Sequence, residues 1–394
     1  MRGQLVRHLP SLVLGILLTY LICTTFDSND WNLLNGQLPS FLVQSKTTNL
    51  YKWDRFKSNK VLKVCSPAWK ERIQNIYNKK PEPRPPKSSN SCKDCRKTID
   101  EILKNYSKPW VKNESRHEAI RTQLSLKCNG FENAIMTQKN TPLGATVVYD
   151  SQKTKSVTVN SEHFNRFAKT YPALNKRRHT CAVIGNGGIL ANSSCGKMID
   201  SAQFVIRCNL APLLNGYEKH VGVKTDIVTA NPSIISHWHD SLLRSRRVFV
   251  ERLCQYGNSK LFLPAFSYVG HTELCMRAFY TIEDFELPIQ PVFFNPNYID
   301  SLNVFWKSFK LKEQRITTGL IMTSLALELC DNVHLYGFWP YSVHPHSFQD
   351  LTAHYYDDLK PTNKHLIPEE FKLLLQLHSQ GVLKLHLGEC KPNK

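Results

Sequence analysis

The sequence has no Asp-x-Asp triplet and few acidic residues, with 32 Asp+Glu against 51 Lys+Arg in 394 residues. The missing triplet disfavours a chelated Mn²⁺ or Mg²⁺ that holds a nucleotide diphosphate. The shortage of acid leaves a net charge of +19, which favours an acidic partner such as nucleic acid, anionic lipid, a phosphorylated donor or an acidic sugar. Hydrophobic residues make up 41% and charged residues 21%, a globular balance that excludes a fully disordered chain, a collagen and a tiny disulfide scaffold. The length suits one large domain of about 250 residues with an appendage.

Charged side chains are also absent from residues 9–23. Basic residues precede this apolar run and acidic residues follow it, so the positive-inside rule places residues 1–8 in the cytosol and everything after Phe26 in the secretory lumen. The sequence therefore predicts a signal-anchor transmembrane helix over residues 9–26, short but sufficient for a thin membrane. The alternative is a cleaved signal peptide, which the lack of a small-x-small cleavage site disfavours.

The cysteine count agrees with a lumenal address, since disulfides persist in oxidising compartments and the chain has 12 cysteines. Cys23 lies in the predicted anchor, which leaves an odd number in the lumen, so at least one thiol is free or bridges to another chain. Tripeptides beginning at Asn105, Asn113 and Asn192 fit the N-glycosylation pattern. Such tripeptides also arise by chance, so they agree with a lumenal location without proving it.

A polar, irregular stretch separates the predicted anchor from the denser part of the chain. Residues 27–115 are predicted to form a stem, because residues 79–90 have the Pro- and Lys-rich composition of an extended linker. Within the stem, Cys92 and Cys95 form a C-x-x-C pair. No second pair follows at zinc spacing, and no strand-helix context suggests a redox motif, so structural disulfides are favoured. Residues 116–394 are predicted to be the lumenal domain.

From about residue 180 onward, short β-branched runs alternate with helical stretches, a pattern typical of an α/β fold with a Rossmann-like, mostly parallel sheet. Helices are predicted over residues 194–201 and 320–329. The predicted strands span residues 181–185, 204–208, 227–230, 248–253, 261–263 and 333–337.

Asn186, Asn209 and Asn231 each follow one of these predicted strands. In open α/β sheets, ligands bind outside the carboxyl ends of the strands. The glycines of Gly185-Asn-Gly-Gly188 allow backbone N–H groups to approach a phosphate, so the three positions predict a nucleotide cleft. Glycine and asparagine are also ordinary turn residues, which explains any one position alone. The spacing does not match the G-x-G-x-x-G dinucleotide fingerprint.

Thr317-Thr-Gly319 precedes an apolar helix, so its hydroxyls and free N–H groups form an N-cap that attracts a phosphate or carboxylate. Ordinary capping explains the same pattern.

Histidines gather after the last strong strand, in His344-Pro-His346, in His354-Tyr-Tyr-Asp357 and at His365. Histidine supplies an acid or base near neutral pH. A metal site is the rival interpretation, but neither His344-Pro-His346 nor His237-Trp-His239 has an evident carboxylate partner. From the residues alone, the chain is a membrane-tethered, metal-free enzyme or binder for a phosphorylated and acidic ligand.

Four segments resemble the motifs of the sialyltransferase family, and the wording of two of them resembles its α-2,8 branch. They are Cys181 to Asp226 for the large motif, Ile316 to Cys330 for the small motif, Tyr336-Gly-Phe-Trp-Pro340 with His354-Tyr-Tyr-Asp357 for the third, and His365 with Glu370 for the H-x-x-x-x-E motif. They occur in the family's order and cover most of residues 180–371.

The resemblance implies a GT-A-like sialyltransferase fold and an inverting, metal-independent transfer from CMP-sialic acid to a sialylated glycoprotein or glycolipid in the Golgi, by a single-pass type II membrane protein. His365 would be the general base toward the acceptor hydroxyl, and His354 would donate to the departing phosphate. The disulfides implied are Cys181–Cys330 and Cys195–Cys390. The residues implied in donor binding are Asn186, Asn209, Thr317, Thr318, Gly319 and Trp339.

Two departures from the family pattern motivate one alternative, a catalytically inactive sialoglycan-binding protein on the same scaffold. The first is Thr-Thr-Gly where relatives often have Ser-Thr-Gly, and the second is a short span from His354 to His365. A nucleic-acid binder is disfavoured because it needs cytosolic or nuclear exposure. The basic tract at residues 153–178 is modest, which favours short oligosialyl products. The oligomeric state stays open, as does the pairing of Cys65, Cys92, Cys95, Cys128, Cys208, Cys254 and Cys275.

Overall fold

The computed structural model describes Cys65 and residues 93–170, 176–244, 246–312, 315–359 and 367–390. The predicted cytoplasmic tail, the predicted anchor at 9–26 and most of the predicted stem lie outside these residues. Within the described part, no helix has the length and apolar character needed to cross a bilayer. The description below concerns the unit that begins at Val61.

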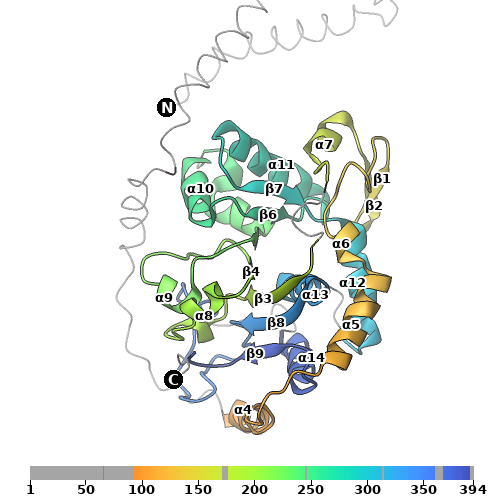
Figure 1. Cartoon of the computed structure of the whole chain (residues 1–394). Coiled ribbons are helices and arrows are strands. Elements are labelled where there is room, and N and C mark those ends of the chain that lie inside the picture. Colours follow the sequence, from red (N-terminus) through yellow and green to blue (C-terminus); the bar gives the residue numbers. More distant parts are fainter. Residues whose placement is uncertain are drawn as a thin grey trace, which may run out of the picture. The chain divides into compact units, whose positions relative to one another are not determined.

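The centre of the fold is a seven-stranded sheet in the order β7-β6-β5-β4-β3-β8-β9, in which every neighbouring pair is parallel (Figure 1). Parallel neighbours require crossover connections, which here are the helices that cover the sheet. The strands are β3 (Arg178–Ile184), β4 (Phe204–Arg207), β5 (Ile227–Thr229), β6 (Lys260–Leu263), β7 (Gln290–Phe293), β8 (Cys330–Tyr336) and β9 (Lys384–His386).

Helices cover both faces of this sheet. One face packs against α4 (Lys93–Tyr106), α5 (Glu114–Lys127), α12 (Pro296–Ser308), α13 (Thr318–Leu329) and α14 (Ile367–Ser379). The opposite face packs against α8 (Gly196–Asp200), α9 (Glu218–Val221), α10 (Arg246–Leu253) and α11 (Val269–Asp284). Shorter helical turns are α6 (Gly130–Asn133), α7 (Ser161–Arg166), η3 (Gly188–Leu190), η4 (Ile234–Trp238), η5 (Asp240–Leu242) and η6 (Cys254–Tyr256). An antiparallel hairpin joins β1 (Thr146–Tyr149) and β2 (Gln152–Thr158).

The buried strands divide their side chains between these two cores. In β3, Cys181 and Val183 face the core with α13, whereas Ala182 and Ile184 face the core with α11. Successive side chains of a strand point to opposite faces, and both faces are covered here, so residues 181–184 of β3 are all apolar and buried. This explains the continuous apolar runs by which the sequence predicts these strands.

The α/β fold predicted from the sequence is confirmed. Five of the six predicted strands match β3, β4, β5, β6 and β8, and the two predicted helices match α8 and α13. The prediction of a strand at residues 248–253 is wrong, because this segment belongs to α10. Phe249, Val250 and Leu253 are buried there at helical spacing, and Arg247 pairs with Glu251 one turn later. The helical period thus prevails over the β-branched composition.

Part of the segment predicted as stem is folded into the body. Helix α4 lies within residues 27–115, and its Ile99 is fully buried in the core that also contains α14. Cys65, also within the predicted stem, forms a disulfide with Cys254. The ordered body therefore extends toward the N-terminus beyond residue 116.

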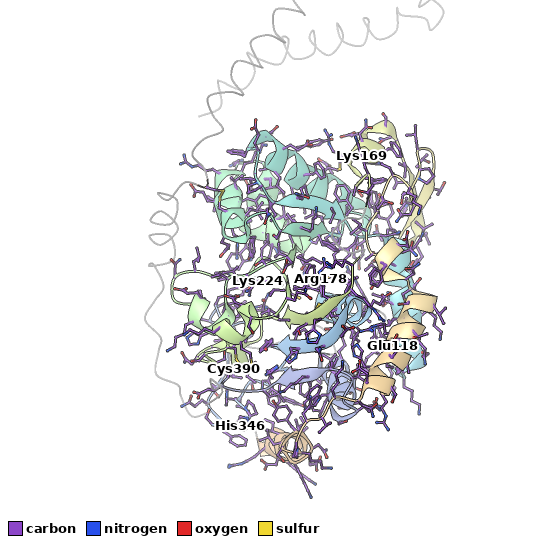
Figure 2. The ribbon with its side chains drawn as sticks, viewed as in Figure 1. Glu118, Lys169, Arg178, Lys224, His346 and Cys390 are labelled. Carbon is purple, nitrogen blue, oxygen red and sulfur yellow. A yellow bond between two sulfur atoms is a disulfide. The ribbon has the colours of Figure 1, made fainter. Side chains whose placement is uncertain are left out.

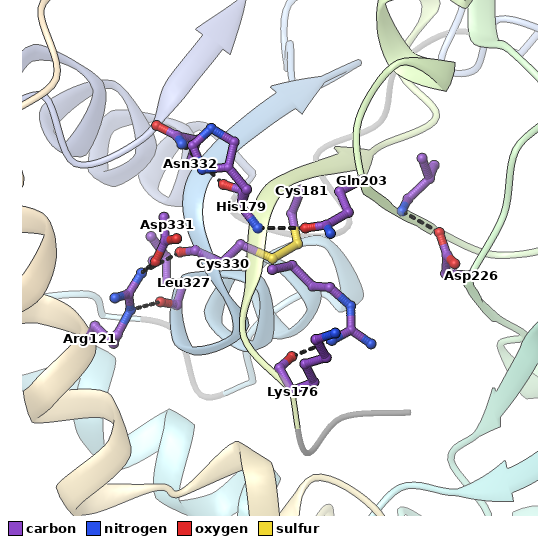
Figure 3. Close-up of a disulfide and its surroundings, with 12 residues drawn as sticks. Arg121, Lys176, His179, Cys181, Gln203, Asp226, Leu327, Cys330, Asp331 and Asn332 are labelled. Atoms are coloured by element: carbon purple, nitrogen blue, oxygen red, sulfur yellow. Dashed lines mark hydrogen bonds and ion pairs between the residues drawn. A yellow bond between two sulfur atoms is a disulfide. The ribbon is translucent and has the colours of Figure 1, made fainter. Parts of the chain in front are cut away.

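The structure contains both disulfides that the resemblance implies. Cys181 on β3 joins Cys330 at the start of β8 (Figure 3), and Cys195 before α8 joins Cys390 after β9. Next to the first bridge, the Arg121 side chain donates to the carbonyl oxygens of Leu327 and Cys330, so it links α5 to the end of α13. Both disulfides connect β3 and the segment that follows it to the last third of the chain. Among the described residues, Cys128, Cys208 and Cys275 are free and buried.

Candidate active site

The carboxyl ends of β3 and β8 lie where the strand order reverses, because the chain proceeds from β3 toward β7 on one side and places β8 and β9 on the other. Such a switch point is the usual ligand site of an open α/β sheet. The turn after β3 lies directly against the turn after β8, since the Gly187 N–H donates to the Gly337 carbonyl at 3.0 Å. A Cβ on Gly187 would lie 2.6 Å from that oxygen, so a side chain there would push the two turns apart.

The three predicted strand-end asparagines are brought together by hydrogen bonds. The Asn186 amide donates to the Cys208 carbonyl at 2.8 Å, and the Asn231 N–H donates to the Asn209 side-chain oxygen at 2.9 Å. The Thr318 hydroxyl in turn donates to the Asn231 side-chain oxygen at 3.2 Å. We call Asn186, Asn209, Asn231 and Thr318 the amide relay. The relay connects the ends of β3, β4 and β5 to the first turn of α13.

Asn209 also has a left-handed backbone, with φ of 62°. A non-glycine residue in this region is uncommon and is often found at functional sites. The Thr229 hydroxyl accepts a hydrogen bond from the Asn209 N–H at 2.9 Å, which holds the conformation.

The N-terminus of α13 is held by a carboxylate from α14. The Thr317 hydroxyl accepts the Leu320 N–H at 3.2 Å and donates to Glu370 at 2.5 Å, while the Thr317 N–H donates to the same carboxylate at 2.7 Å. Glu370 is buried. The next N–H groups, of Thr318 and Gly319, have no acceptor among the described residues. Free N–H groups and the helix dipole give this end a partial positive charge that attracts anions.

His354 lies against the turn after β3. Its backbone forms a bridge with Gly187, and the N–H of the following Tyr355 donates to the Asn186 carbonyl at 3.0 Å. The His354 Nδ1 lies 2.5 Å from the Asp357 carboxylate, and the imidazole is partly exposed. No described residue is bonded to the other ring nitrogen, Nε2. A carboxylate at Nδ1 orients the ring and leaves Nε2 for a substrate.

Two further predicted site residues are Trp339 and His365. Trp339 is buried, its indole N–H donates to the Val343 carbonyl at 2.8 Å, and its ring packs edge-on against Phe371 of α14. Its side-chain hydrogen bond is thus used within the protein. His365 lies outside the described residues, so its role as base stays a prediction. Glu370, five residues later in the sequence, is fixed at Thr317.

The H-x-H pairs do not gather metal ligands. His346 Nε2 is hydrogen-bonded to the Leu387 carbonyl at 3.0 Å, and His239 is buried beside Phe249. Burial, followed by the charge of Arg252, lowers the pKa of His239 to about 4. In the described part of the chain, no three His, Cys, Asp or Glu side chains are arranged to hold a metal ion.

The predicted glycosylation residues lie outside the sheet. Asn105 in α4 and Asn192 after η3 are exposed. Asn113 caps α5, where its side-chain oxygen accepts the Arg116 N–H at 3.0 Å. Its amide nitrogen is not used by that cap, so capping and glycan attachment are compatible.

The sequence analysis did not find the contacts that hold the site together. It assigned no partner to Glu370, although the Thr317–Glu370 contact joins the small motif to the H-x-x-x-x-E motif. It also assigned no role to Asp357, which orients His354. A signal was available for Asp357, because a carboxylate three residues after a candidate acid is a common orienting partner. The signal for Glu370 was absent, because Thr317 and Glu370 are 53 residues apart.

Comparison with known proteins identifies the class. Residues 135–382 match the model of glycosyltransferase family 29 (sialyltransferase). The chain belongs to this family, as its motifs predict. Members use CMP-sialic acid as donor.

Among curated proteins, human alpha-2,8-sialyltransferase 8E is 42% identical over 282 residues, 71% of this chain and 75% of that protein. Human alpha-2,8-sialyltransferase 8F is 38% identical over 286 residues, 72% of this chain and 71% of that protein. The bovine alpha-N-acetylneuraminide alpha-2,8-sialyltransferase is 41% identical over 285 residues, 72% of this chain and 80% of that protein. The whole chain resembles most the sixth member of the α-2,8 branch, and the comparisons place it with this branch without singling out that member.

Proposed function

We propose that this protein transfers sialic acid from CMP-sialic acid to the 8-hydroxyl of a terminal sialic acid, which gives α-2,8-linked di- or oligosialic acid. The observation that carries the proposal is family membership together with relatives named α-2,8-sialyltransferases over most of the lumenal part. The alternative of an inactive sialoglycan-binding protein is not supported, because these relatives are named as transferases.

The donor is proposed to bind at the carboxyl edge of the sheet, along the amide relay and the N-terminus of α13. Amide side chains offer both donors and acceptors without negative charge, which suits a nucleotide monophosphate. The free N–H groups of Thr318 and Gly319 are the kind of backbone donors that bind phosphate. The proposed donor site includes Trp339 as a packing residue beside the turn after β3. The backbone carbonyl oxygen of Trp339 would lie 3.5 Å from a Cβ atom built on Gly187.

The proposed reaction is a direct displacement at the anomeric carbon of sialic acid. The acceptor oxygen forms the new glycosidic bond while the bond to the CMP phosphate oxygen breaks, and the electron pair of that bond leaves with CMP. His365 takes the proton from the acceptor hydroxyl, and His354 donates from Nε2 to the departing phosphate. A positioned acid or base contributes about 10²- to 10⁴-fold in rate. The partial charge at α13 favours the transition state, because the phosphate gains negative charge as it leaves.

The Thr317–Glu370 contact supports the assignment of His365. It fixes the start of α14 to the N-terminus of α13, and His365 precedes Glu370 by five residues. A short tether of this kind limits how far His365 can lie from Thr317.

The acceptor is proposed to be a sialylated glycoprotein O-glycan or glycolipid, and the product short. Basic side chains upstream of β3 are partly neutralised by acids, because Arg166 pairs with Glu283 at 3.4 Å and Arg177 with Glu118 at 3.2 Å. Glu118 is labelled on α5 in Figure 2. A paired basic surface attracts a long polyanion less strongly than a free one.

The proposed location is the Golgi membrane, with the body in the lumen and residues 9–26 as anchor. Support comes from the three disulfides formed by Cys65, Cys181 and Cys195 with their partners, because disulfides persist in oxidising compartments. Protease protection in sealed vesicles tests the topology. The account requires the body to be resistant until detergent is added.

The test of the function is transfer from labelled CMP-sialic acid to a panel of sialylated and desialylated glycans, with and without EDTA. We expect label on sialylated acceptors, release by an α-2,8-cleaving sialidase, and the same rate in EDTA because no metal is proposed in the step. Absence of transfer to every sialylated acceptor would reject the proposal.

A further inference from the structure

Three side chains form a cluster one strand beyond the amide relay. Tyr268 follows β6, His271 lies in the first turn of α11, and Arg315 precedes Thr317 by two residues. The Arg315 guanidinium lies over the Tyr268 ring, 5.4 Å from its centroid. The Tyr268 and His271 rings pack edge to face, with centroids 5.0 Å apart. Side chains from two segments far apart in the sequence, the start of α11 and the residues before α13, thus meet at one place.

The polar groups of this cluster have no partners among the described residues. Arg315 is exposed and forms no ion pair with a described acid. By contrast, Arg277 of α11 pairs with Glu273, and Arg246 pairs with Asp284. The Tyr268 hydroxyl makes no hydrogen bond with a described residue, and the buried His271 Nδ1 makes none either. A buried nitrogen without a partner is costly unless a ligand or water satisfies it.

Asp150, whose pKa is affected by the charge of Arg315, already has hydrogen-bond partners. Asp150 lies in the turn after β1, and its carboxylate accepts hydrogen bonds from the hydroxyls of Ser151 and Ser267. Burial raises the pKa of Asp150, and the charge of Arg315 lowers it by a smaller amount. No hydrogen bond or ion pair joins the Arg315 guanidinium to Asp150 within the described part of the chain.

The cluster continues the same edge of the sheet as the proposed donor site. Strand β6 pairs with β5, whose end carries Asn231, and Asn231 is bonded to Thr318 three residues after Arg315. Arg315 therefore lies between the N-terminus of α13, which contacts the relay, and Tyr268, which follows β6.

We propose that Arg315, with Tyr268 and His271, binds the carboxylate of the acceptor's terminal sialic acid and so selects sialylated over neutral acceptors. The planar guanidinium matches a carboxylate with two parallel hydrogen bonds, and the tyrosine face beneath it keeps it oriented. The Tyr268 hydroxyl offers a further hydrogen bond to the carboxylate or to a neighbouring hydroxyl, and the His271 ring packs against the Tyr268 ring. The inference rests on the proposed function, because it names how that acceptor is recognised.

The experiment compares Arg315→Gln with wild type on a sialylated acceptor and on its methyl ester, which lacks the carboxylate charge. We expect wild type to lose about 10- to 100-fold in kcat/KM on the ester, because a hydrogen-bonded charge is lost. Arg315→Gln should show the same loss on the free acid and no further loss on the ester. The KM for CMP-sialic acid should change less than about twofold, because the donor lies at the relay.

The matched control is Lys312→Gln, which removes one exposed positive charge three residues away. It should leave acceptor KM and ester discrimination unchanged. Tyr268→Phe is a second variant that removes only the hydroxyl and should raise acceptor KM by a smaller factor. Melting temperatures verify that all variants are folded.

Two results separate the inference from the function on which it rests. If wild type transfers to sialylated acceptors and Arg315→Gln discriminates acid from ester as wild type does, the inference is overturned and the function stands. If wild type transfers to no sialylated acceptor, the proposed function fails and the inference falls with it.

Discussion

At the scale of single residues, the described part of the candidate site consists of the amide relay and His354, and the proposed base His365 lies outside the described residues. The His354 side chain is hydrogen-bonded to Asp357. The backbones of His354 and Tyr355 contact the turn after β3. The His354–Asp357 contact is local, so the sequence around it contains that information. The contacts with the turn after β3 and the Thr317–Glu370 contact join segments far apart in the chain, so local sequence does not predict them.

Replacing Asp357 with Asn tests the orientation of His354. We expect kcat to fall about 10- to 100-fold, because the ring loses the carboxylate that fixes its orientation and tautomer. The KM for CMP-sialic acid should stay within about twofold, since the relay is untouched. Steady-state kinetics checks this, with the exposed neighbour Asp358→Asn as control. An unchanged kcat in Asp357→Asn would remove His354 from the reaction.

Replacing Glu370 with Gln tests the Thr317–Glu370 contact that joins α13 to α14, here called the joint. The variant loses a charge-assisted hydrogen bond to the Thr317 hydroxyl, and we expect about 1–3 kcal/mol less stability by denaturant unfolding. We also expect a lower kcat/KM, because His365 is tethered to this joint. The control Glu369→Gln alters only a surface pair with Lys372. Full activity together with lower stability would show that the joint does not position the base.

At the scale of elements, helix α13 is the one most clearly predicted from sequence and the one on which the site most depends. Its apolar pattern and Thr-Thr-Gly start match the observed Thr318–Leu329, with Thr317 as N-cap. Strand β9 was missed, although Leu383, Leu385 and Leu387 are buried and alternate with Lys384 and His386 in the pattern of a strand. Because β9 has only three residues, its alternating apolar pattern is too short to predict a strand. Residues 248–253 show the opposite error, in which β-branched residues occupy a helix.

Helix α13 also carries a buried acid that makes its packing depend on pH. Burial raises the pKa of Glu328 to about 7, although the Gly130 N–H and the Tyr298 hydroxyl donate to it. Because the folded pKa exceeds the unfolded one, the contribution of Glu328 is fully present below the unfolded pKa of 4.5 and is lost as pH rises through about 7.

We therefore expect wild type to lose stability between pH 5 and pH 7.5 relative to Glu328→Gln, whose side chain does not titrate. Urea unfolding at several pH values measures this difference. Parallel curves for the two proteins across the range would contradict the raised pKa.

At the scale of the whole molecule, disulfides connect distant parts of the chain around the site. Cys195–Cys390 spans 195 residues and Cys181–Cys330 spans 149. The α/β fold was predictable because alternating apolar runs are local, whereas the pairing of Cys65 with Cys254 was not, because spacing alone does not choose among cysteines.

Removing Cys195–Cys390 by a double serine substitution should cost about 2–5 kcal/mol, because the unfolded chain regains freedom over a long loop. The change frees the segment after β9 from the turn before α8, so we expect a lower melting temperature in the purified protein. The control is Cys275→Ser, which alters a buried free thiol and no cross-link. An equal loss in the control would mean that packing, and not the cross-link, accounts for the effect.

The most direct test of the account is CMP binding by Asn209→Asp, measured by calorimetry on the purified protein. The substitution keeps the shape of the relay and places a negative charge where the nucleotide phosphate is proposed to lie. We predict at least about tenfold weaker CMP binding, with a wild-type melting temperature and with unchanged binding in Asn297→Asp, which carries the same change at an exposed position of α12. CMP binding as tight as wild type in a folded Asn209→Asp protein would contradict the placement of the donor along the relay.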